Sequence, residues 1–426
     1  MNLPSNWTPD QLRVVLLDQF NAFWERDTGV ERDRLAEVEK AAASPHAVIV
    51  SGLRRVGKST LMAQFAHRLG KDAFYYVNFE EDRLLGIQAG DADELYRTLV
   101  EVFGERKIFI LDEIQNVPGW ERFVRRFMDL GYKFYITGSN AALLSRELGT
   151  LLTGRYVPIE LFPFSFPEFL NFRGERVPDL SRMTSTERAR LSAALLAYLE
   201  AGGIPDALKY PDLPLLRSLY DDVLYRDIAA RYRLEAVSAL RELAFYLFSN
   251  PANLVSYNKL KGQLNLGSVN TVSSYIEYLE NSWLIFTLNV YAFSVKRQQV
   301  APKKVYTIDT GMVNSVGFRF SPNTGRLLEN AVFLALRRGT RDIYYYRTQD
   351  GLEVDFYLPG EGRLVQVAQS LDQPETRARE LRAIEAAVGE VRVESALVLA
   401  ETGNEDLEIG GVPVRIRSVS EWMAGG

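Results

Sequence analysis

The stretch VIVSGLRRVGKSTLMAQF, from Val48 to Phe65, decides the fold of this chain. It begins with apolar residues typical of a buried strand, passes Gly52 and Gly57, and continues with apolar residues at helical spacing. The loop fits the pattern G-x-x-x-x-G-K-[ST], in which backbone N–H groups surround an anion and the following helix presents its positive end to it. The sequence therefore predicts a strand–loop–helix unit that binds the phosphates of a nucleotide.

The residues of this loop have distinct expected roles. Lys58 is expected to reach the β- and γ-phosphates, and the Ser59 hydroxyl is expected to ligate Mg²⁺. The residues expected to contact the nucleotide are Gly52, Leu53, Arg54, Arg55, Val56, Gly57, Lys58, Ser59 and Thr60. A chance glycine-rich turn is the alternative, and the strand and helix patterns on its two sides argue against it.

A second apolar strand, in KIFILDEIQNV, ends in the acidic pair Asp112 and Glu113. A buried parallel strand would bring this pair to the carboxyl edge of the same sheet. We expect Asp112 to hold the metal ion and Glu113 to polarise the water that attacks the γ-phosphate. The predicted chemistry is ATP hydrolysis with Mg²⁺.

A third apolar strand, KFYITGSN, ends in Thr137, Ser139 and Asn140. Ser139 and Asn140 are candidates to contact the γ-phosphate or the water, and the alternative is that either one only caps the following helix AALLSREL. Arg155 follows that helix and is a candidate finger for the nucleotide of a neighbouring subunit, because a planar guanidinium suits a phosphate. A surface arginine at the start of a strand is an equal alternative. A finger arginine needs a neighbour, so we expect a homo-oligomer, with a hexameric ring as one candidate.

Composition excludes several other chemistries. The 426 residues are 47% apolar, which predicts two to four domains with a large core, and the net charge of −5 means that any DNA contact must use a local basic patch. The chain has no cysteine and two histidines, His46 and His67, which argues against disulfides, thiol nucleophiles, zinc sites and histidine catalysis. No apolar run is long enough to span a membrane and no leader pattern opens the chain, so a cytoplasmic protein without membrane contact is expected.

Seven stretches in order carry a resemblance to a known family: GLRRVGKST, FILDEIQNV, YITGSN, TGR with ELFPFSFPEF, GGIPDAL, LYRDI and KKVYTIDTGMVNS. Together they resemble the prokaryotic AAA-type ATPases that join an AAA+-like core to a conserved C-terminal region of the kind catalogued as a domain of unknown function. The resemblance implies an α/β P-loop NTPase with a parallel sheet and helical lid, followed by a winged helix and an α/β nuclease-like domain of the restriction-endonuclease type. It does not indicate what the ATPase acts on.

The expected organisation has five parts. They are an N-terminal helical segment (1–45, with Thr8 as helix cap), the P-loop ATPase core (46–165), a helical lid (166–238), a winged helix (239–300) and a degenerate nuclease-like domain (301–426). Within the lid, Arg226 is expected either to sense the nucleotide or bridge subunits, or to form a structural ion pair with Asp227.

The winged-helix segment carries the clearest basic patch outside the P-loop region. The third helix of this segment would present Asn270, Ser273 and Ser274 on a small polar face that could enter a DNA groove. The candidate nucleic-acid contacts are Lys259, Lys261, Asn270, Lys296, Arg297, Lys303 and Lys304. The alternative is a solvated wing that docks a protein.

The nuclease-like segment lacks part of the expected active site. Glu329 and Asp355 occupy the first two acidic places of the restriction-type pattern, but Gln366, Val367 and Ala368 stand where Glu-x-Lys is expected. Without that carboxylate and that cation, we expect a nuclease-like fold without nuclease activity, serving as a DNA-binding or assembly platform.

Two function classes remain. The first is an AAA+-type Mg²⁺-dependent ATPase that remodels DNA or translocates along it, with branched and single-stranded DNA as candidate forms. The second is a nucleotide-dependent switch whose C-terminal half recruits a protein. A GTPase is disfavoured, because Asn258-Lys259 is not followed by the aspartate that would read guanine.

Overall fold

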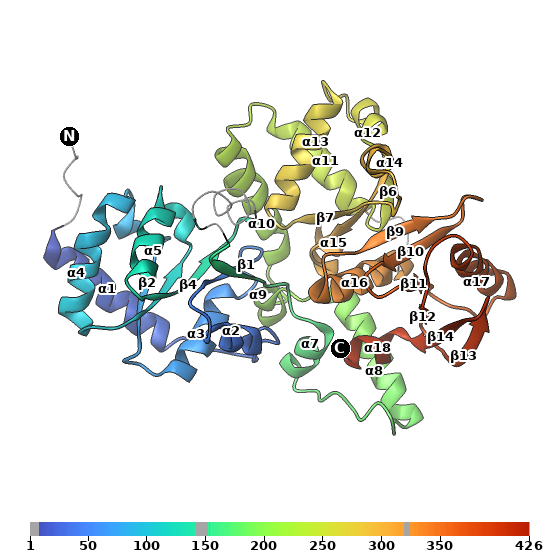
Figure 1. Cartoon of the computed structure of the whole chain (residues 1–426), viewed down its shortest axis with the longest axis horizontal. Coiled ribbons are helices and arrows are strands. Elements are labelled where there is room, and N and C mark those ends of the chain that lie inside the picture. The colour runs from blue at the N-terminus through green and yellow to red at the C-terminus, as the bar shows by residue number, and fades with distance from the viewer. Residues whose placement is uncertain (1–7, 142–151, 153, 319–323, 426) are drawn as a thin grey trace. The chain divides into compact units, whose positions relative to one another are not determined.

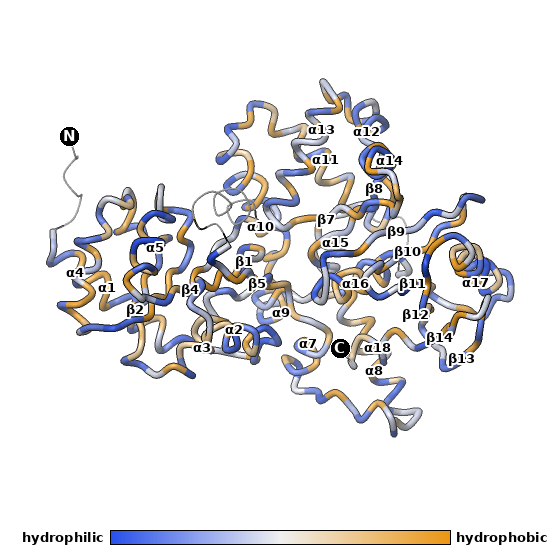
Figure 2. The backbone as a smooth tube through the Cα atoms, in the orientation of Figure 1, coloured by the Kyte–Doolittle hydropathy of each residue, from blue (hydrophilic) through white to orange (hydrophobic). Residues whose placement is uncertain are grey.

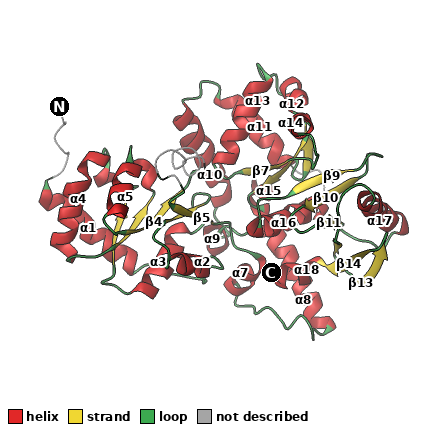
Figure 3. Cartoon of the chain, in the orientation of Figure 1, coloured by secondary structure: helices red, strands yellow, loops and turns green. Residues whose placement is uncertain are grey.

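The computed structural model describes residues 8–141, 152, 154–318 and 324–425. The chain divides into two compact units, which are Met1–Phe162 with Asn281–Trp283, and Pro163–Glu280 with Leu284–Gly426 (Figure 1). Each unit is α/β, with helices flanking its strands (Figure 3). The α/β class predicted from the sequence is confirmed.

The first unit is built on a five-stranded parallel sheet with strand order β2-β3-β4-β1-β5. All five residues of β1 are buried, as expected for a parallel strand covered on both faces. Because β4 lies between β1 and β3, the segments that follow these three strands meet at one edge of the sheet. The strands are β1 (Ala47–Ser51), β2 (Phe74–Asn78), β3 (Ile108–Asp112), β4 (Lys133–Gly138) and β5 (Tyr156–Glu160).

Helices of the N-terminal region belong to this same unit. Helix α1 (Pro9–Trp24) begins at a capping box formed by Thr8 and Gln11, as the sequence predicts. Its Leu12, Val15 and Leu16 share one hydrophobic core with the strands and with α4 and α5. The remaining helices here are α2 (Leu35–Ala41), α3 (Lys58–Leu69), α4 (Ala92–Phe103) and α5 (Trp120–Asp129).

The second unit begins with helices and a small sheet. Its three short strands are antiparallel in the order β6-β8-β7. Tyr225 to Ile228 lie in a π-helical segment, η5 (Val223–Ala230), in which Arg226 is exposed and Asp227 is buried. The elements are α7 (Phe166–Phe172), α8 (Ser185–Ala201), α9 (Pro205–Lys209), α10 (Leu215–Asp222), α11 (Val237–Ser249), β6 (Asn253–Val255), α12 (Tyr257–Gln263), α13 (Val269–Asn281), β7 (Ile285–Leu288), α14 (Val295–Val300) and β8 (Lys303–Thr307).

A mixed six-stranded sheet completes the second unit, with strand order β13-β14-β12-β11-β10-β9. In β14, which lies between β13 and β12, buried and less buried residues alternate, and Figure 2 colours the tube by the hydropathy of each residue. The elements are α15 (Thr310–Val316), α16 (Thr324–Gly339), β9 (Tyr344–Arg347), β10 (Glu353–Leu358), β11 (Arg363–Val367), α17 (Pro374–Val388), β12 (Ser395–Ala400), β13 (Asn404–Ile409), β14 (Val412–Ser418) and α18 (Val419–Gly425).

Two motifs that lie far apart in the sequence, GGIP and TIDTG, meet inside the second unit. The buried Asp309 carboxylate accepts hydrogen bonds from the backbone N–H groups of Gly203 (2.6 Å) and Met312 (2.8 Å). A Cβ atom at Gly202 would lie 2.2 Å from Asp309 Oδ1, so only glycine fits there. Asp309 therefore fixes the turn that follows α8.

Asp309 gives the second unit a predictable response to pH. Burial raises the pKa of Asp309 to about 6 although backbone N–H groups oppose this shift. Since this value exceeds that of the unfolded chain, the stabilising contribution of protonation is present below about pH 4 and is lost as the pH rises through 6. We expect the unfolding free energy of wild type to fall by about 3 kcal/mol relative to Asp309→Asn across this window. Urea unfolding of both proteins between pH 4 and 7.5 measures the difference, and parallel curves would contradict it.

Candidate nucleotide site

The loop between β1 and α3 has the backbone geometry of an anion cradle. Gly57 caps α3 with φ +98°, and a Cβ atom on Gly52 would lie 2.2 Å from the Leu161 carbonyl oxygen. Arg55 has φ +62°, a conformation that non-glycine residues rarely adopt and that is concentrated at functional sites. Both glycines of the motif are thus required by close approach or by backbone conformation.

Arg32 supports this loop from the N-terminal region. Its buried guanidinium donates to the carbonyl oxygens of Val56 (2.8 Å) and Phe162 (2.7 Å). Gln64 on α3 accepts a hydrogen bond from the Arg32 backbone N–H (3.1 Å). Sequence reasoning missed Arg32, because nothing local to GVERDRL indicates a contact with residues 24 and 130 positions further along the chain.

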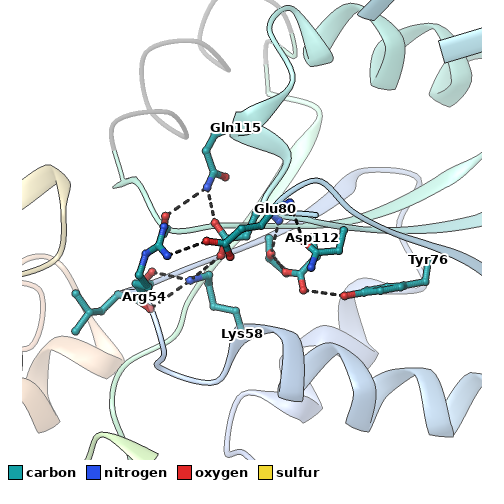
Figure 4. Close-up of polar contacts among 12 residues, drawn as sticks. Arg54, Lys58, Tyr76, Glu80, Asp112 and Gln115 are labelled. Carbon is teal, nitrogen blue, oxygen red and sulfur yellow. Dashed lines mark hydrogen bonds and ion pairs between the residues drawn. The ribbon is translucent and has the colours of Figure 1, made fainter. Parts of the chain in front are cut away.

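Lys58 and Glu113 form an ion pair. Figure 4 shows Lys58 among Arg54, Asp112 and Gln115. Lys58 is 4% exposed, and its ammonium lies 3.3 Å from Glu113 Oε1 and donates to the carbonyl oxygens of Gly52 and Leu53, both at 3.2 Å. Burial acts to raise the pKa of Glu113, but Lys58 and Gln115 outweigh it and the pKa is lowered. Glu113 is therefore held as a carboxylate, the form in which it can accept a proton.

Asp112 lies beside this pair in a shell of hydroxyl groups. The Thr137 hydroxyl donates to Asp112 Oδ1, and the Tyr76 hydroxyl donates to Oδ2 at 3.1 Å. Burial and the charge of Glu113 raise the pKa of Asp112, while hydrogen bonds from Ser59 and Thr137 oppose the rise. A buried carboxylate beside a second one accumulates negative charge that a divalent cation would neutralise. The Ser59 hydroxyl and the Asp112 carboxylate are the hard oxygen ligands that Mg²⁺ prefers, so the residues present fit this ion.

The end of β4 is connected to Glu113 through Gln115. The Gln115 side-chain amide donates to Glu113 Oε2 and to Ser139 Oγ, the latter at 3.3 Å. Thr137 Oγ1 also accepts from the Glu113 backbone N–H at 3.1 Å, and Glu113 has φ +52°. Gln115 escaped sequence reasoning because it stands in a short 3-10 turn, two residues after the acidic pair, where no spacing rule applies.

The other residues expected in this site have different surroundings. Arg54 forms an ion pair with Glu80 at 2.8 Å, and Asn140 is 3% exposed at the end of β4. The helix AALLSREL that Ser139 or Asn140 was expected to cap spans residues 141–148 and, beyond Ala141, lies outside the described residues. Arg155 precedes β5 and pairs with Asp129 at 2.6 Å. Since the strands are parallel, Arg155 lies at the amino edge of the sheet, opposite the P-loop, and does not belong to the nucleotide site of its own chain.

Most of the basic residues expected to contact nucleic acid are exposed. Lys259 and Lys261 on α12, Asn270 on α13, and Lys296 and Arg297 on α14 are all exposed. Lys303 is half-buried, with its ammonium 5.6 Å from the centre of the Tyr257 ring.

The prediction that Lys304 contacts nucleic acid is wrong. Successive residues of a strand point to opposite faces, so Lys304 and Lys303 lie on different faces of β8, and Lys304 is 2% exposed. Its ammonium lies 2.8 Å from each of three carboxylates, Glu329, Glu353 and Asp355. Burial opposes the charge of Lys304, but these carboxylates raise its pKa. Lys304 therefore cannot reach a phosphate at the surface.

The same cluster changes the interpretation of the nuclease-like residues. Glu329 and Asp355 do lie together, and Lys304 supplies the cation that the sequence lacked at position 368. Gln366 accepts from the Asp355 backbone N–H (3.1 Å) and donates to Glu380 (2.6 Å). The expectation that these carboxylates lack a cation is wrong. The cation is Lys304 on β8, which precedes α16 in the chain, whereas the sequence pattern places a lysine at position 368. Absence of nuclease activity stays a prediction.

The strand order, the glycine-rich loop and the acidic pair together define a P-loop nucleotide-binding protein. A family model described as an AAA domain matches residues 44–170. Two models, Domain of unknown function (DUF8612) and Domain of unknown function (DUF4143), match residues 192–323 and 324–419.

Relatives match over most of the chain. Protein MJ1544 of Methanocaldococcus jannaschii is 34% identical over 370 residues, covering 84% of this chain and 82% of that protein. A Haemophilus influenzae protein is 30% identical over 342 residues, covering 77% and 83%. Both are described as uncharacterized. The chain belongs to the family of AAA-type P-loop ATPases with these C-terminal domains, and the resemblance seen in the sequence is confirmed.

Solved structures show lower similarity. The Walker-type ATPase paby2304 of Pyrococcus abyssi has a TM-score of 0.44 at 15% identity, covering 69% of this chain and 99% of that chain. The Orc1 protein of Aeropyrum pernix in complex with DNA has a TM-score of 0.33 at 17% identity, covering 69% and 95%. The parallel strand order and the AAA match define the fold class. Among the helices of the described residues, none combines the length and hydropathy needed to cross a bilayer.

Proposed function

We propose that this chain is an Mg²⁺-dependent ATPase that couples ATP binding and hydrolysis to the remodelling of DNA. The observation that supports hydrolysis is the convergence of Lys58, Asp112 and Glu113 at one sheet edge, with Ser59 bonded to Asp112. Mg²⁺ held by Ser59 and Asp112 would neutralise phosphate charge as the γ-phosphate leaves. Glu113 would accept the proton of the attacking water, and Gln115 would orient its carboxylate.

Ser139 and Asn140 are proposed to report the state of the γ-phosphate. Gln115 donates hydrogen bonds to both Glu113 and Ser139. A phosphate that displaced Lys58 from Glu113 would therefore change the contacts of Ser139 at the end of β4 through Gln115. We also retain Arg155 as a proposed finger acting on a neighbouring subunit. Its position at the opposite edge of the sheet is consistent with action on another chain only.

The DNA role is supported by the architecture around the basic residues. Helices α11, α12 and α13 with the sheet β6-β8-β7 have the order of a winged helix, which we propose for this region. We also propose the helical lid at 166–238 and the domain boundaries given in the sequence analysis. The third strand, β8, lies beyond the boundary expected at residue 300.

The second candidate is a nucleotide-dependent switch whose C-terminal half binds a protein. The exposed apolar residues around α14 favour it, since Phe293 is 87%, Val295 67% and Val300 74% exposed. ATP turnover would then be indifferent to DNA.

DNA stimulation of ATP turnover distinguishes the two functions. We expect turnover of wild type to rise severalfold with single-stranded, duplex or branched DNA and the effect to weaken with salt. Lys259→Ala/Lys261→Ala should lose most of this stimulation and keep basal turnover, because the variant loses phosphate contacts but no residue of the nucleotide site. The salt dependence of the stimulation should also become weaker, since each lost phosphate contact lowers the salt slope. The matched control is Lys40→Ala/Lys71→Ala, which removes two exposed lysines of the first unit. Indifference of wild type to every DNA form would favour the switch.

A further inference from the structure

One face of the six-stranded sheet carries arginines. The α17 side of the sheet is apolar, with Leu364, Val398 and Val414 in one core with that helix. Side chains alternate along a strand, so the neighbouring residues lie on the opposite face. Register places Arg363 beside Ser395, and Leu397 beside Arg415, across β11, β12 and β14. On this face, arginines of β11 and β14 therefore lie on the two sides of β12, whose side chains here, Ser395 and Leu397, are small or apolar.

These residues line an open groove of about 590 Å³. Helix α18 contributes Trp422, which is half-buried, to the wall of the groove. This volume is within the range of ligand sites. The groove thus combines an apolar floor, one indole ring and three guanidinium groups, from Arg363, Arg415 and Arg417.

The charges in this groove are not balanced. Arg417 is held by Asp406 and by the Glu405 carbonyl oxygen at 3.0 Å. Among the described lining residues, Glu421 is the one carboxylate, and Arg188 already pairs with it at 3.2 Å.

Arg415 carries the excess positive charge. Its side chain is exposed, and among the described residues it forms no ion pair, since Asp406, which stands opposite it on β13, is bonded to Arg417. Arg363 is only partly neutralised, by Glu361 at 3.1 Å with both side chains nearly half exposed. The groove consequently attracts anions in a molecule whose net charge is −5.

We propose that this groove binds a single-stranded nucleic acid, with phosphates at Arg415 and Arg363 and a base against Trp422. Arginine suits phosphate oxygens, and an indole face stacks on any base, so the site would hold single strands with little sequence preference. An acidic peptide would use the arginines but would gain little from the indole. The proposal extends the DNA-directed function proposed above, but it uses a surface separate from the basic residues of α12 and α14.

The test is fluorescence anisotropy of a labelled oligothymidine with the full chain, free of nucleotide, across a salt series. We expect Arg415→Ala and Trp422→Ala each to weaken binding roughly fivefold or more. Arg415→Ala should also lower the salt slope by about 0.7, the value for one phosphate contact on a single strand. Trp422→Phe should retain most of the affinity because it keeps an aromatic face. The matched control is Arg392→Ala, which removes an arginine of the same unit that is 82% exposed and pairs with Glu394.

The outcomes separate this proposal from the DNA-directed function as a whole. Suppose that Arg415→Ala and Trp422→Ala bind oligothymidine as wild type does, while Lys259→Ala/Lys261→Ala does not bind it. This result would overturn the proposed site in the groove but would support the DNA-directed function. If wild type does not bind oligothymidine, the proposed nucleic-acid site in the groove is wrong. The DNA-directed function is then still tested by DNA stimulation of ATP turnover. Binding of polyglutamate in place of oligothymidine, lost in Arg415→Ala, would overturn the nucleic-acid assignment in favour of an acidic partner. Melting curves of each variant identify any loss that comes from unfolding.

Discussion

Glu113→Gln is expected to bind ATP with nearly wild-type affinity and to hydrolyse it 10²- to 10⁴-fold more slowly, the usual effect of losing a general base. The amide has the shape of the carboxylate but cannot accept the proton of the attacking water. Glu113 is also one of the acceptors around Lys58, at 3.3 Å, so its loss does not remove the ammonium from the phosphate site. Phosphate release in single and multiple turnover measures the rate, and calorimetry with ATP and Mg²⁺ measures the affinity.

Glu80→Gln is the matched control for this prediction. Glu80 follows the neighbouring strand β2 and pairs with Arg54, and its side chain is 46% exposed. Its substitution should change turnover by less than about threefold, because an exposed pair of this kind contributes little. Equal slowing of both variants, or normal turnover of Glu113→Gln, would contradict the assignment of Glu113 as the base.

Lys58→Ala is expected to weaken ATP binding by roughly 10- to 150-fold and to abolish measurable turnover. The Lys58 ammonium is the charge expected to reach the β- and γ-phosphates, and a charged hydrogen bond contributes about 1.5–3 kcal/mol. The variant also leaves the buried Glu113 carboxylate without its ion-pair partner, and the pKa of Glu113 should rise. Competition with a fluorescent ATP analogue measures the affinity.

Two further variants separate phosphate binding from folding. Lys71→Ala removes an exposed lysine just beyond the end of the same helix and should bind ATP normally. Lys58→Ala/Glu113→Gln removes the unpaired carboxylate, so any instability of Lys58→Ala that comes from Glu113 should be relieved while binding stays weak. If Lys58→Ala bound ATP as tightly as wild type, the P-loop assignment would be wrong.

The parts of the site that were predictable from the sequence are those fixed by local chain geometry. The P-loop lies between a strand and a helix, and Asp112, Glu113 and Ser139 follow strands that run parallel, so one sheet edge brings them together. Arg32 was not predictable, because its contacts join segments far apart in the chain. Gln115 was not predictable, because no spacing rule applies in its short turn and its bond to Ser139 requires β3 and β4 to lie side by side.

Lys303 and Lys304 show why the exposure of a charged side chain cannot be predicted from the sequence alone. Adjacent lysines appear equivalent in the sequence, yet the alternation of a strand leaves Lys303 half-buried near the Tyr257 ring and directs Lys304 into three carboxylates. The strand itself could have been predicted from KKVYT, but its burial required knowledge that α16 and β10 pack beside it. For the same reason, the carboxylates at positions 329 and 355 were found while their cation was not.

Helix α1 has a practical consequence for dissecting this protein. Phe23 stacks on Tyr76 with ring centres 3.8 Å apart, and Gln19 bonds to both backbone groups of Asn78 at the rim of β2. The AAA family model begins at residue 44, so an expression fragment cut at that boundary would lack Phe23 and Gln19, leave the Tyr76 ring uncovered, and open the edge of β2 to other strands. Such a fragment would tend to self-associate, and its low activity would then be misread as a requirement for the C-terminal half.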